Sequence, residues 1–510
     1  MGEIMLVRLL LSIGILAASP VAAASLQSDI RAWRQANEKE IVGRLEALAT
    51  IPSVAADKAG LDRTADMLGS ERRRRGFEVR LLEAAPGAPK AVFGRLDTPG
   101  ARRTVTFYAH YDGQPVTPSQ WASDPFKPVM RKGALADGGA AIAWREAKGA
   151  LDPDWRLFAR GASDDKASIV AFLAGFDALR ASGRKPKVNL RIFWEGEEEA
   201  GSPNLAPLLA RETQLLKSDL WLIGDGPVHQ SRRPTLYFGA RGVAGLEATI
   251  YGPLRPLHDG HYGNWVPNPI AMAATLLAAM RDEEGRILIP GVADAVRPLS
   301  PAEQAALAAL PPVEAALRDQ FAIGRSEGRE GLTASTMRPA LNLRGIRAGA
   351  VGDEAANAIP SEARFSIDFR LVPDQQPEAI RRAVERFLRG RGWTIVEAMP
   401  DEATRRAHER LIRLRWESGY PALRTDIGLP VSRAVAATME RAAGRPLVLL
   451  PMIGGSVPLH LIDAALDVPI IGLPIANHDN NQHAANENLR LGNLWDGVES
   501  YAALIGDLDW

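Results

Sequence analysis

The sequence predicts an α/β protein in which a mainly parallel sheet, flanked by helices, is interrupted by a smaller α+β domain of two layers. In the first half of the chain, short apolar runs typical of buried strands alternate with helical segments. Strands separated by helices form βαβ units, whose strands run parallel. The strand-like runs cover residues 79–82, 105–109, 190–194 and 220–223, and the clearest helix between them covers residues 167–181.

Two helices are expected before the first of these strands. Apolar positions recur at helical spacing over residues 28–49, and a second helix over residues 61–75 ends at Gly76. Arginines occupy all positions from 72 to 75. We interpret them as cations that interact favourably with the helix dipole, although such a cluster also fits an anion site.

The pattern changes near Gly242, where alternating strands replace the continuous apolar runs. The strands are expected at residues 243–251, 340–347, 364–372 and 393–397, with helices at 269–281 and 377–389. A strand and helix pattern then returns and includes a buried run at residues 468–475. The sequence therefore predicts a larger domain made of residues 25–242 and 423–510, with residues 243–422 inserted into it.

Residues 1–24 have the pattern of a secretory signal peptide. Arg8 precedes an apolar run over residues 9–18, and the small residues Val21 to Ala24 follow Ser19 and Pro20. The run is short for a membrane span, which favours a cleaved signal over an uncleaved anchor or an apolar N-terminal helix. We therefore expect an exported chain that begins near Ser25 and does not remain in the membrane.

Composition narrows the chemistry that the chain can perform. Lys and Arg number 61 and so do Asp and Glu, so the net charge of zero gives no argument for nucleic-acid binding. The chain has no cysteine, which excludes disulfides, thiolate zinc sites and cysteine nucleophiles. Any bound metal must be held by carboxylates and by some of the eight histidines.

Histidines and carboxylates follow the predicted strands, at the edge of a parallel sheet where functional groups gather. Each alone is more typical of a solvated surface, but their joint placement favours a site. Nitrogen and oxygen ligands without thiolate suit zinc, manganese or cobalt. A carboxylate that bridges two such ions, beside an unligated glutamate, would activate water for hydrolysis. The candidates are His110, Asp112, Asp164, Glu197 to Glu199, Asp225 and His483.

Six segments resemble a known family. They are residues 108–115, 159–166, 195–202, 224–226, 239–242 and 483–488, which span nearly the whole chain after the leader. They resemble the co-catalytic di-zinc exopeptidase and aminoacylase family, which includes carnosinases, glutamate carboxypeptidase, succinyl-diaminopimelate desuccinylase and acetylornithine deacetylase. Residues 121–126 and the glycine-rich residues 454–458 favour its carnosinase-like branch. The chain departs from the family at Ala159 and Ala167, where glycine is usual.

The resemblance implies a role for each candidate. Two zinc ions per subunit, with Mn²⁺ or Co²⁺ also suitable, would be held by Asp164 as the bridge, by His110 and Asp225 at one ion, and by Glu199 and His483 at the other. Glu198 would be the general base and Asp112 would orient His110; the assignment among the glutamates can slip by one position. His478 competes with His483, which we prefer because Asn486 and Glu487 follow it as in the family.

The inserted domain would then serve as a lid and a dimerisation domain. By resemblance, His258 reaches the active site of the partner subunit in a homodimer and polarises the scissile carbonyl. Arg370 suits a terminal carboxylate, which an arginine grips with two hydrogen bonds. Asn357, Gly455 and Ser456 would also contact the substrate.

These expectations combine into an exported, zinc-dependent metallopeptidase that hydrolyses the amide bond of dipeptides or of C-terminal residues. The alternative is an N-acyl-amino-acid amidohydrolase; a metal-free binding protein would have lost a ligand or the base, and none is missing. Glu417 stands where carnosinase-like relatives have a substrate-binding histidine, and residues 132–153 form a longer link than usual. His229 and His408 are expected at the surface, and His261 and His460 stay unassigned.

Overall fold

The larger domain is built on an eight-stranded sheet in the order β1-β2-β6-β3-β7-β19-β8-β18. The computed structural model describes residues 20–294, 296–455, 457 and 459–510. Strands β6, β3, β7 and β19 run parallel to one another, and β8 and β18 form a second parallel pair that is antiparallel to β19. Strands β1 and β2 add an antiparallel edge beside β6. The strands are β1 (Glu78–Leu82), β2 (Ala91–Leu96), β3 (Thr104–His110), β6 (Asn189–Glu195), β7 (Leu220–Ile223), β8 (Thr235–Tyr237), β18 (Val448–Leu450) and β19 (Ile470–Gly472).

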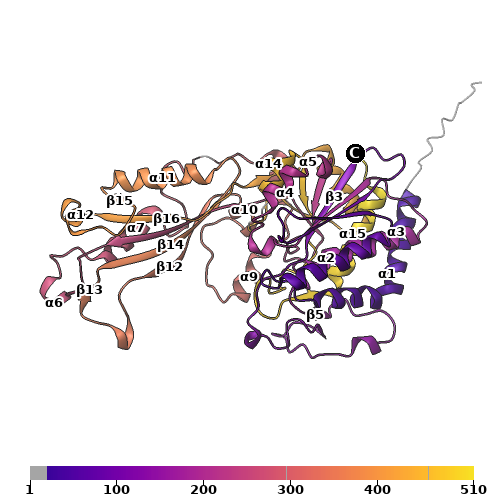
Figure 1. Cartoon of the computed structure of the whole chain (residues 1–510), viewed down its shortest axis with the longest axis horizontal. Helices are drawn as coiled ribbons and strands as arrows, with labels where there is room; N and C mark the ends of the chain where they lie inside the picture. The colour runs from indigo at the N-terminus through magenta and orange to yellow at the C-terminus, as the bar shows by residue number, and fades with distance from the viewer. Residues whose placement is uncertain (1–19, 295, 456, 458) are drawn as a thin grey trace, which may run out of the picture.

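Helices cover both faces of this sheet, which confirms the predicted fold class (Figure 1). One face packs against α1 (Pro20–Ala49), α2 (Lys58–Arg73), α3 (Lys166–Ala181), α13 (Pro430–Ala443) and α15 (Leu491–Asp507), and the other against α4 (Leu205–Arg211), α5 (Thr213–Leu216) and α14 (Leu459–Leu466). Residues of β3 alternate between the two cores, with Phe107 in the first and Tyr108 in the second. Burial on both faces explains why these strands read as continuous apolar runs.

Two arginines at the end of α2 point into the protein rather than into solvent. Arg72 is fully buried and its guanidinium lies 3.4 Å from the centre of the Trp194 ring. Arg75 donates to both carboxylate oxygens of Asp177 in α3, at 2.8 and 2.6 Å. Arg72 and Arg75 therefore anchor the C-terminal end of α2 to the sheet and to α3, which the helix-dipole interpretation did not foresee.

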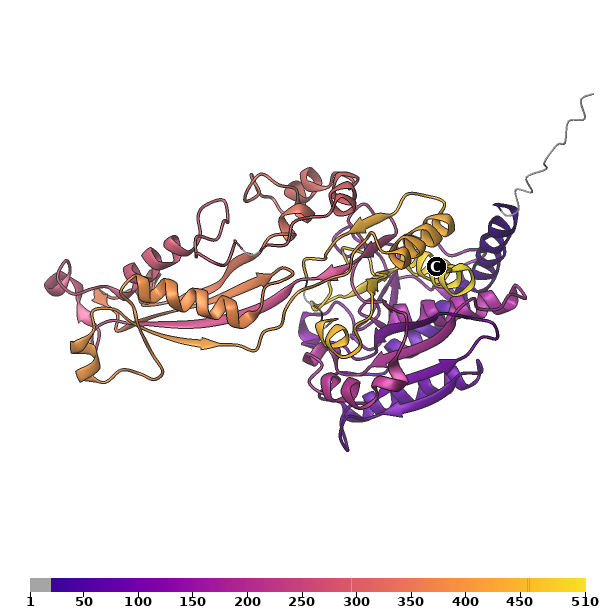
Figure 2. The same cartoon turned by 90° about the horizontal axis from the view of Figure 1, so that it is seen from above.

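A five-stranded sheet, in the order β12-β14-β10-β16-β15, forms an elongated arm that projects from the larger domain (Figures 1 and 2). We call this sheet and its helices the arm. Its strands are β10 (Gly242–Tyr251), β12 (Ala340–Arg347), β14 (Glu362–Leu371), β15 (Thr394–Val396) and β16 (Leu411–Trp416). Helices α7 (Pro269–Met280) and α11 (Pro377–Gly390) pack on one face around a separate apolar core.

Short elements complete the arm and its junction with the larger domain. At the tip lie β11 (Leu257–His258), α6 (Asp259–Tyr262), β13 (Ala358–Ile359) and α12 (Glu402–Ala407) (Figure 1). Nearer the larger domain come α8 (Pro301–Ala308), α9 (Glu314–Gln320) and α10 (Leu332–Thr336), and β9 (Gly239–Ala240) pairs with β17 (Leu423–Arg424).

A small three-stranded sheet holds two loops next to each other beside the main sheet. It consists of β4 (Val129–Arg131), β5 (Arg156–Phe158) and β20 (Asn488–Arg490), with residues 132–155 connecting β4 to β5. Because β20 pairs with β5, the loop that precedes residue 488 lies beside the loop that follows residue 158. These two loops carry His483 and Asp164.

The predicted leader lies mostly outside the described residues, which begin at Pro20. The expected cleavage point near Ser25 falls within the first turns of α1. Among the helices that the structure describes, none has the length and apolar character needed to cross a membrane.

Candidate active site

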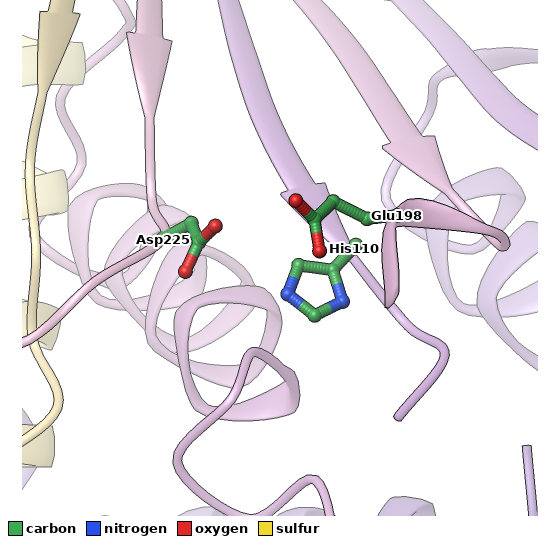
Figure 3. A group of neighbouring side chains, drawn as sticks. All are labelled: His110, Glu198 and Asp225. Carbon is green, nitrogen blue, oxygen red and sulfur yellow. The ribbon is translucent and has the colours of Figure 1, made fainter. Parts of the chain in front are cut away.

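Three candidate side chains meet at the carboxyl ends of adjacent parallel strands. His110 is the last residue of β3, Glu198 follows β6 by three residues, and Asp225 follows β7 by two. They face one another in Figure 3, and each offers a ligand atom within 4.8 Å of the others. The end of a parallel sheet is the expected place for such a group.

A second group of three lies beside the first. Asp164, Glu199 and His483 also offer ligand atoms within 4.8 Å of one another. Asp164 joins the two groups, because its Oδ1 is 3.1 Å from His110 Nε2 and its Oδ2 is 3.1 Å from His483 Nε2. The carboxylate therefore lies between two imidazoles, as a bridge between two metal ions requires. His478 belongs to neither group.

The two groups stabilise added positive charge. Burial and the nearby carboxylate of Asp164 raise the pKa of Asp225 to about 7, and hydrogen bonds to Asp164 and Glu199 raise the pKa of His483 to about 10. Burial and the charge of Asp225 also raise the pKa of Glu198. Glu199 Oε1 is buried and accepts no hydrogen bond within the part of the chain that the structure describes. Crowded carboxylates with raised proton affinity and an unused acceptor fit two divalent cations.

Asp112 connects the first group to the glutamate turn. Its Oδ1 lies 3.3 Å from His110 Nδ1, which leaves Nε2 as the metal-binding nitrogen. The same carboxylate accepts hydrogen bonds from the backbone N–H groups of Glu198, at 3.2 Å, and of Glu199, at 3.0 Å. Asp112 thus positions the glutamates as well as the histidine, which is more than the sequence predicted.

Glu487 is a positioning residue that the sequence analysis did not single out. Its side chain is fully buried, and Oε1 accepts from the Ser163 N–H, the Ser163 hydroxyl and the Asp164 N–H at 2.9 to 3.0 Å. Oε2 accepts from Arg160 Nη1 at 2.8 Å and from the Gly161 N–H at 3.0 Å. The only signal in the sequence was its place in the segment 483–488. Glu487 holds the loop that presents Asp164.

The two groups open into a cavity of about 610 Å³, a size typical of small-ligand sites. Glu198, Asp225 and His483 line one side. Arg370, from the end of β14 in the arm, also lines the cavity, and its Nε donates to Asp368 Oδ2 at 2.6 Å. Apolar residues form much of the remainder: Val228, Leu332, Leu450, Met452, Ile453 and Val457. Gly455 contributes to the wall, and Ser456 lies outside the described residues.

His258 and Asn357 are remote from this cavity in the same chain. The Asp259 N–H donates to the Asn357 carbonyl at 3.1 Å, and β11, which contains His258, pairs with β13. Both side chains are exposed, and α6, which follows His258, lies at the far end of the arm (Figure 1). The structure thus brings these two residues together, away from the metal-binding groups.

The structure also shows where His229, His408 and Glu417 lie. The surface prediction was wrong for His229, which is buried and lines the cavity, whereas His408 is exposed. A buried histidine among charged residues gave no signal in the sequence. Glu417 pairs with Arg344 on the arm at 2.8 Å and is not among the residues that line the cavity.

Comparison with known proteins shows the family of this chain. A model of the peptidase family M20/M25/M40 matches residues 106–507, so the chain belongs to this family. It is therefore a hydrolase of the metallo-exopeptidase class.

Particular relatives are similar over nearly the whole chain. The chain is 26% identical over 491 residues to the Cys-Gly metallodipeptidase dug1 of Schizosaccharomyces pombe, covering 92% of this chain and 95% of the relative. The fold matches human carnosine dipeptidase 1 with a TM-score of 0.72 at 21% identity, covering 95% and 98% of the two chains. It also matches the metallo-carboxypeptidase Sso-CP2 of Sulfolobus solfataricus with a TM-score of 0.72 at 24% identity, covering 92% and 98%.

Replacing Glu487 should weaken metal binding without touching a candidate ligand. In Glu487→Gln, the amide NH₂ replaces an oxygen that accepts hydrogen bonds, so that it faces N–H donors of the loop, and Arg160 loses its buried charged partner. We expect the affinity for zinc to fall by about 10- to 100-fold, as for other groups that orient ligands. Competition with a chromogenic chelator measures this affinity. The exposed Glu409→Gln is the control, and equal affinities in both variants would contradict the role of Glu487.

Proposed function

We propose that the chain is a zinc-dependent dipeptidase with two metal ions per subunit. The observation that carries the proposal is the Asp164 carboxylate, which lies between His110 and His483, beside a cavity that His483 and Arg370 line. The dipeptidase activities named for the S. pombe and human relatives support the substrate class.

The ligands favour zinc among the divalent ions. Imidazole and carboxylate without thiolate suit Zn²⁺, and also Mn²⁺ or Co²⁺. His110 and Asp225 would hold one ion and Glu199 and His483 the other, with Asp164 shared. Two such ions supply a water of lowered pKa and polarise the scissile carbonyl.

Glu198 is placed to move the proton in this reaction. Its carboxylate lies in the first group beside His110 and Asp225, and it lines the cavity. From this position the carboxylate can take a proton from the attacking water and pass it to the leaving amine. The backbone N–H of Glu198 is fixed by Asp112, which limits the motion of the base.

Arg370 gives the cavity its preference for short substrates. A guanidinium binds a carboxylate with two parallel hydrogen bonds, so a free C-terminus is the group that Arg370 suits. The carboxylate then lies within one cavity of about 610 Å³ that Glu198, Asp225 and His483 also line, which leaves room for few residues on either side of the scissile bond. These features favour exopeptidase action on dipeptides.

Removing the base should abolish turnover and leave the metal in place. For Glu198→Ala, we expect kcat on dipeptides to fall by about 10²-fold or more, with two zinc ions still present by elemental analysis. Glu409→Ala serves as an exposed control. Turnover near that of the wild type in Glu198→Ala would contradict the assignment. A wild type that cleaves N-acetyl or N-succinyl amino acids but no dipeptide would favour the amidohydrolase alternative.

We further propose that the active enzyme is a homodimer in which His258 acts on the partner's site. His258 and Asn357 lie together at the exposed tip of the arm, where they cannot serve the cavity of their own chain without a large rearrangement. In the dimer that we propose, each tip would lie against the other subunit, and two-fold symmetric dimers are the commonest oligomers. His258 would then stabilise the developing oxyanion.

Mixing two inactive variants tests catalysis between subunits. Glu198→Ala and His258→Ala each lack one essential group, but a mixed dimer has one site with both groups intact. After subunit exchange, half of the dimers are mixed, so about a quarter of the wild-type activity should return. Mass spectrometry verifies the exchange, and a mixture of two copies of the same variant is the control. No recovery in exchanged dimers would exclude the contribution of His258 in trans.

We also propose that the chain is exported with cleavage near Ser25, on the basis of the pattern in residues 1–24. Expression of the full chain in a Gram-negative host should place a product lacking the leader outside the cytoplasm, as intact-mass analysis of cell fractions can measure. Ile13→Arg interrupts the apolar run and should retain the leader. A wild-type chain that keeps residues 1–24 in the cytoplasm would contradict the proposal.

A further inference from the structure

His229 is a buried histidine in the wall of the cavity, outside the two metal-binding groups. It lies on the segment that follows Asp225, between β7 and β8, and its exposed fraction is 5%. Its backbone N–H donates to Thr235 Oγ1 at 3.0 Å, which fixes the segment against the start of β8. The neighbouring Val228 and Gln230 line the same cavity.

Local hydrogen bonds determine which ring nitrogen carries the proton. The Ser231 backbone N–H donates to His229 Nδ1 at 3.1 Å, and the Ser231 hydroxyl oxygen lies 3.0 Å from the same atom. A backbone N–H can only donate, so Nδ1 presents its lone pair. The neutral imidazole therefore carries its hydrogen on Nε2. Within the part of the chain that the structure describes, Nε2 donates to no protein group, and this atom is not completely buried.

The surroundings keep this imidazole neutral. Burial lowers the pKa of His229, and the positive charges of His478 and Arg233 lower it further, against the opposing effect of Glu314. The Glu314 carboxylate already accepts the backbone N–H groups of Val313 and Leu332, each at 3.1 Å. His229 therefore adds a neutral N–H donor to a cavity wall that is otherwise largely apolar.

We propose that His229 is a specificity-determining residue, whose Nε2–H donates a hydrogen bond to a carbonyl or carboxylate oxygen of the substrate. This inference rests on the proposed function, because it places a dipeptide in the cavity. A substrate oxygen gains a hydrogen bond at this largely apolar wall, whereas an ammonium group or an apolar group leaves the donor unpaired. Arg370 and His229 then give the cavity one cationic and one neutral contact for substrate oxygens.

Two substitutions separate this binding role from a structural one. In His229→Asn, the amide oxygen can take the place of Nδ1 and accept from the Ser231 N–H, but the side chain is too short to present a donor to the cavity. In His229→Gln, the amide NH₂ can take the place of Nε2, but the bond to the Ser231 N–H is lost. A structural role predicts damage from Gln and not from Asn, and a binding role predicts the reverse.

The experiment measures kcat, KM, zinc content and thermal unfolding for both variants on a panel of dipeptides. We expect KM to rise about three- to tenfold in His229→Asn, with kcat and zinc content little changed, and KM near the wild-type value in His229→Gln. The exposed His408→Asn is the matched control. Unchanged KM in His229→Asn, or a loss that appears in His229→Gln and not in His229→Asn, would overturn the proposal.

Failure of the proposed function gives a different result. If the wild type cleaves no dipeptide, the same variants are compared on N-acetyl and N-succinyl amino acids, which offer the same kinds of acceptor oxygen. A rise in KM confined to His229→Asn then supports the contact while the dipeptidase proposal fails. Equal KM values on these substrates, or hydrolysis of neither class, would overturn the role of His229 as well.

Discussion

The clamp formed by Glu487 is the interaction on which the rest of the site depends. One buried carboxylate accepts hydrogen bonds from three backbone N–H groups, a serine hydroxyl and the guanidinium of Arg160. A buried carboxylate is tolerated only when such partners surround it, so the loop before α3 and the loop before β20 stabilise each other's shape. Asp164 is consequently positioned by its backbone, and its carboxylate can lie between two imidazoles although neighbouring negative charges oppose it.

The site combines rigidly held candidate metal ligands with proposed substrate contacts from several parts of the protein. The candidate metal ligands lie at strand ends of the main sheet and on the two loops next to the small sheet, and the close-packed cores on both faces of the main sheet restrict the movement of the strands. The substrate contacts proposed above lie at the end of β14, in the glycine-rich segment before α14, at His229 and, under the dimer proposal, on a second chain. The candidate metal ligands therefore belong to the larger domain alone, whereas the proposed substrate contacts also involve the arm.

Much of the fold could be predicted because buried parallel strands give an unambiguous pattern. Strands β3, β6 and β7 and helix α3 appear within a residue or so of their expected bounds, and the ligands at their ends followed from the topology. Strands β2 and β16 were not predicted, because neither forms a continuous apolar run. Strand β2 contains Gly94 and lies at the antiparallel edge, and in β16 apolar residues such as Ile412 alternate with arginines. Glu487 and His229 were missed as functional residues because burial of a polar side chain depends on partners distant in sequence, which no local pattern reveals.

The distance in sequence between the two loops of the clamp has a consequence for biosynthesis. Arg160 and Glu487 are 327 residues apart, with the whole arm between them. During translation, the β-strands that supply His110 and Asp225 emerge long before the segment that fixes Asp164 and provides His483. A nascent chain therefore lacks the complete pair of metal-binding groups until synthesis is almost complete.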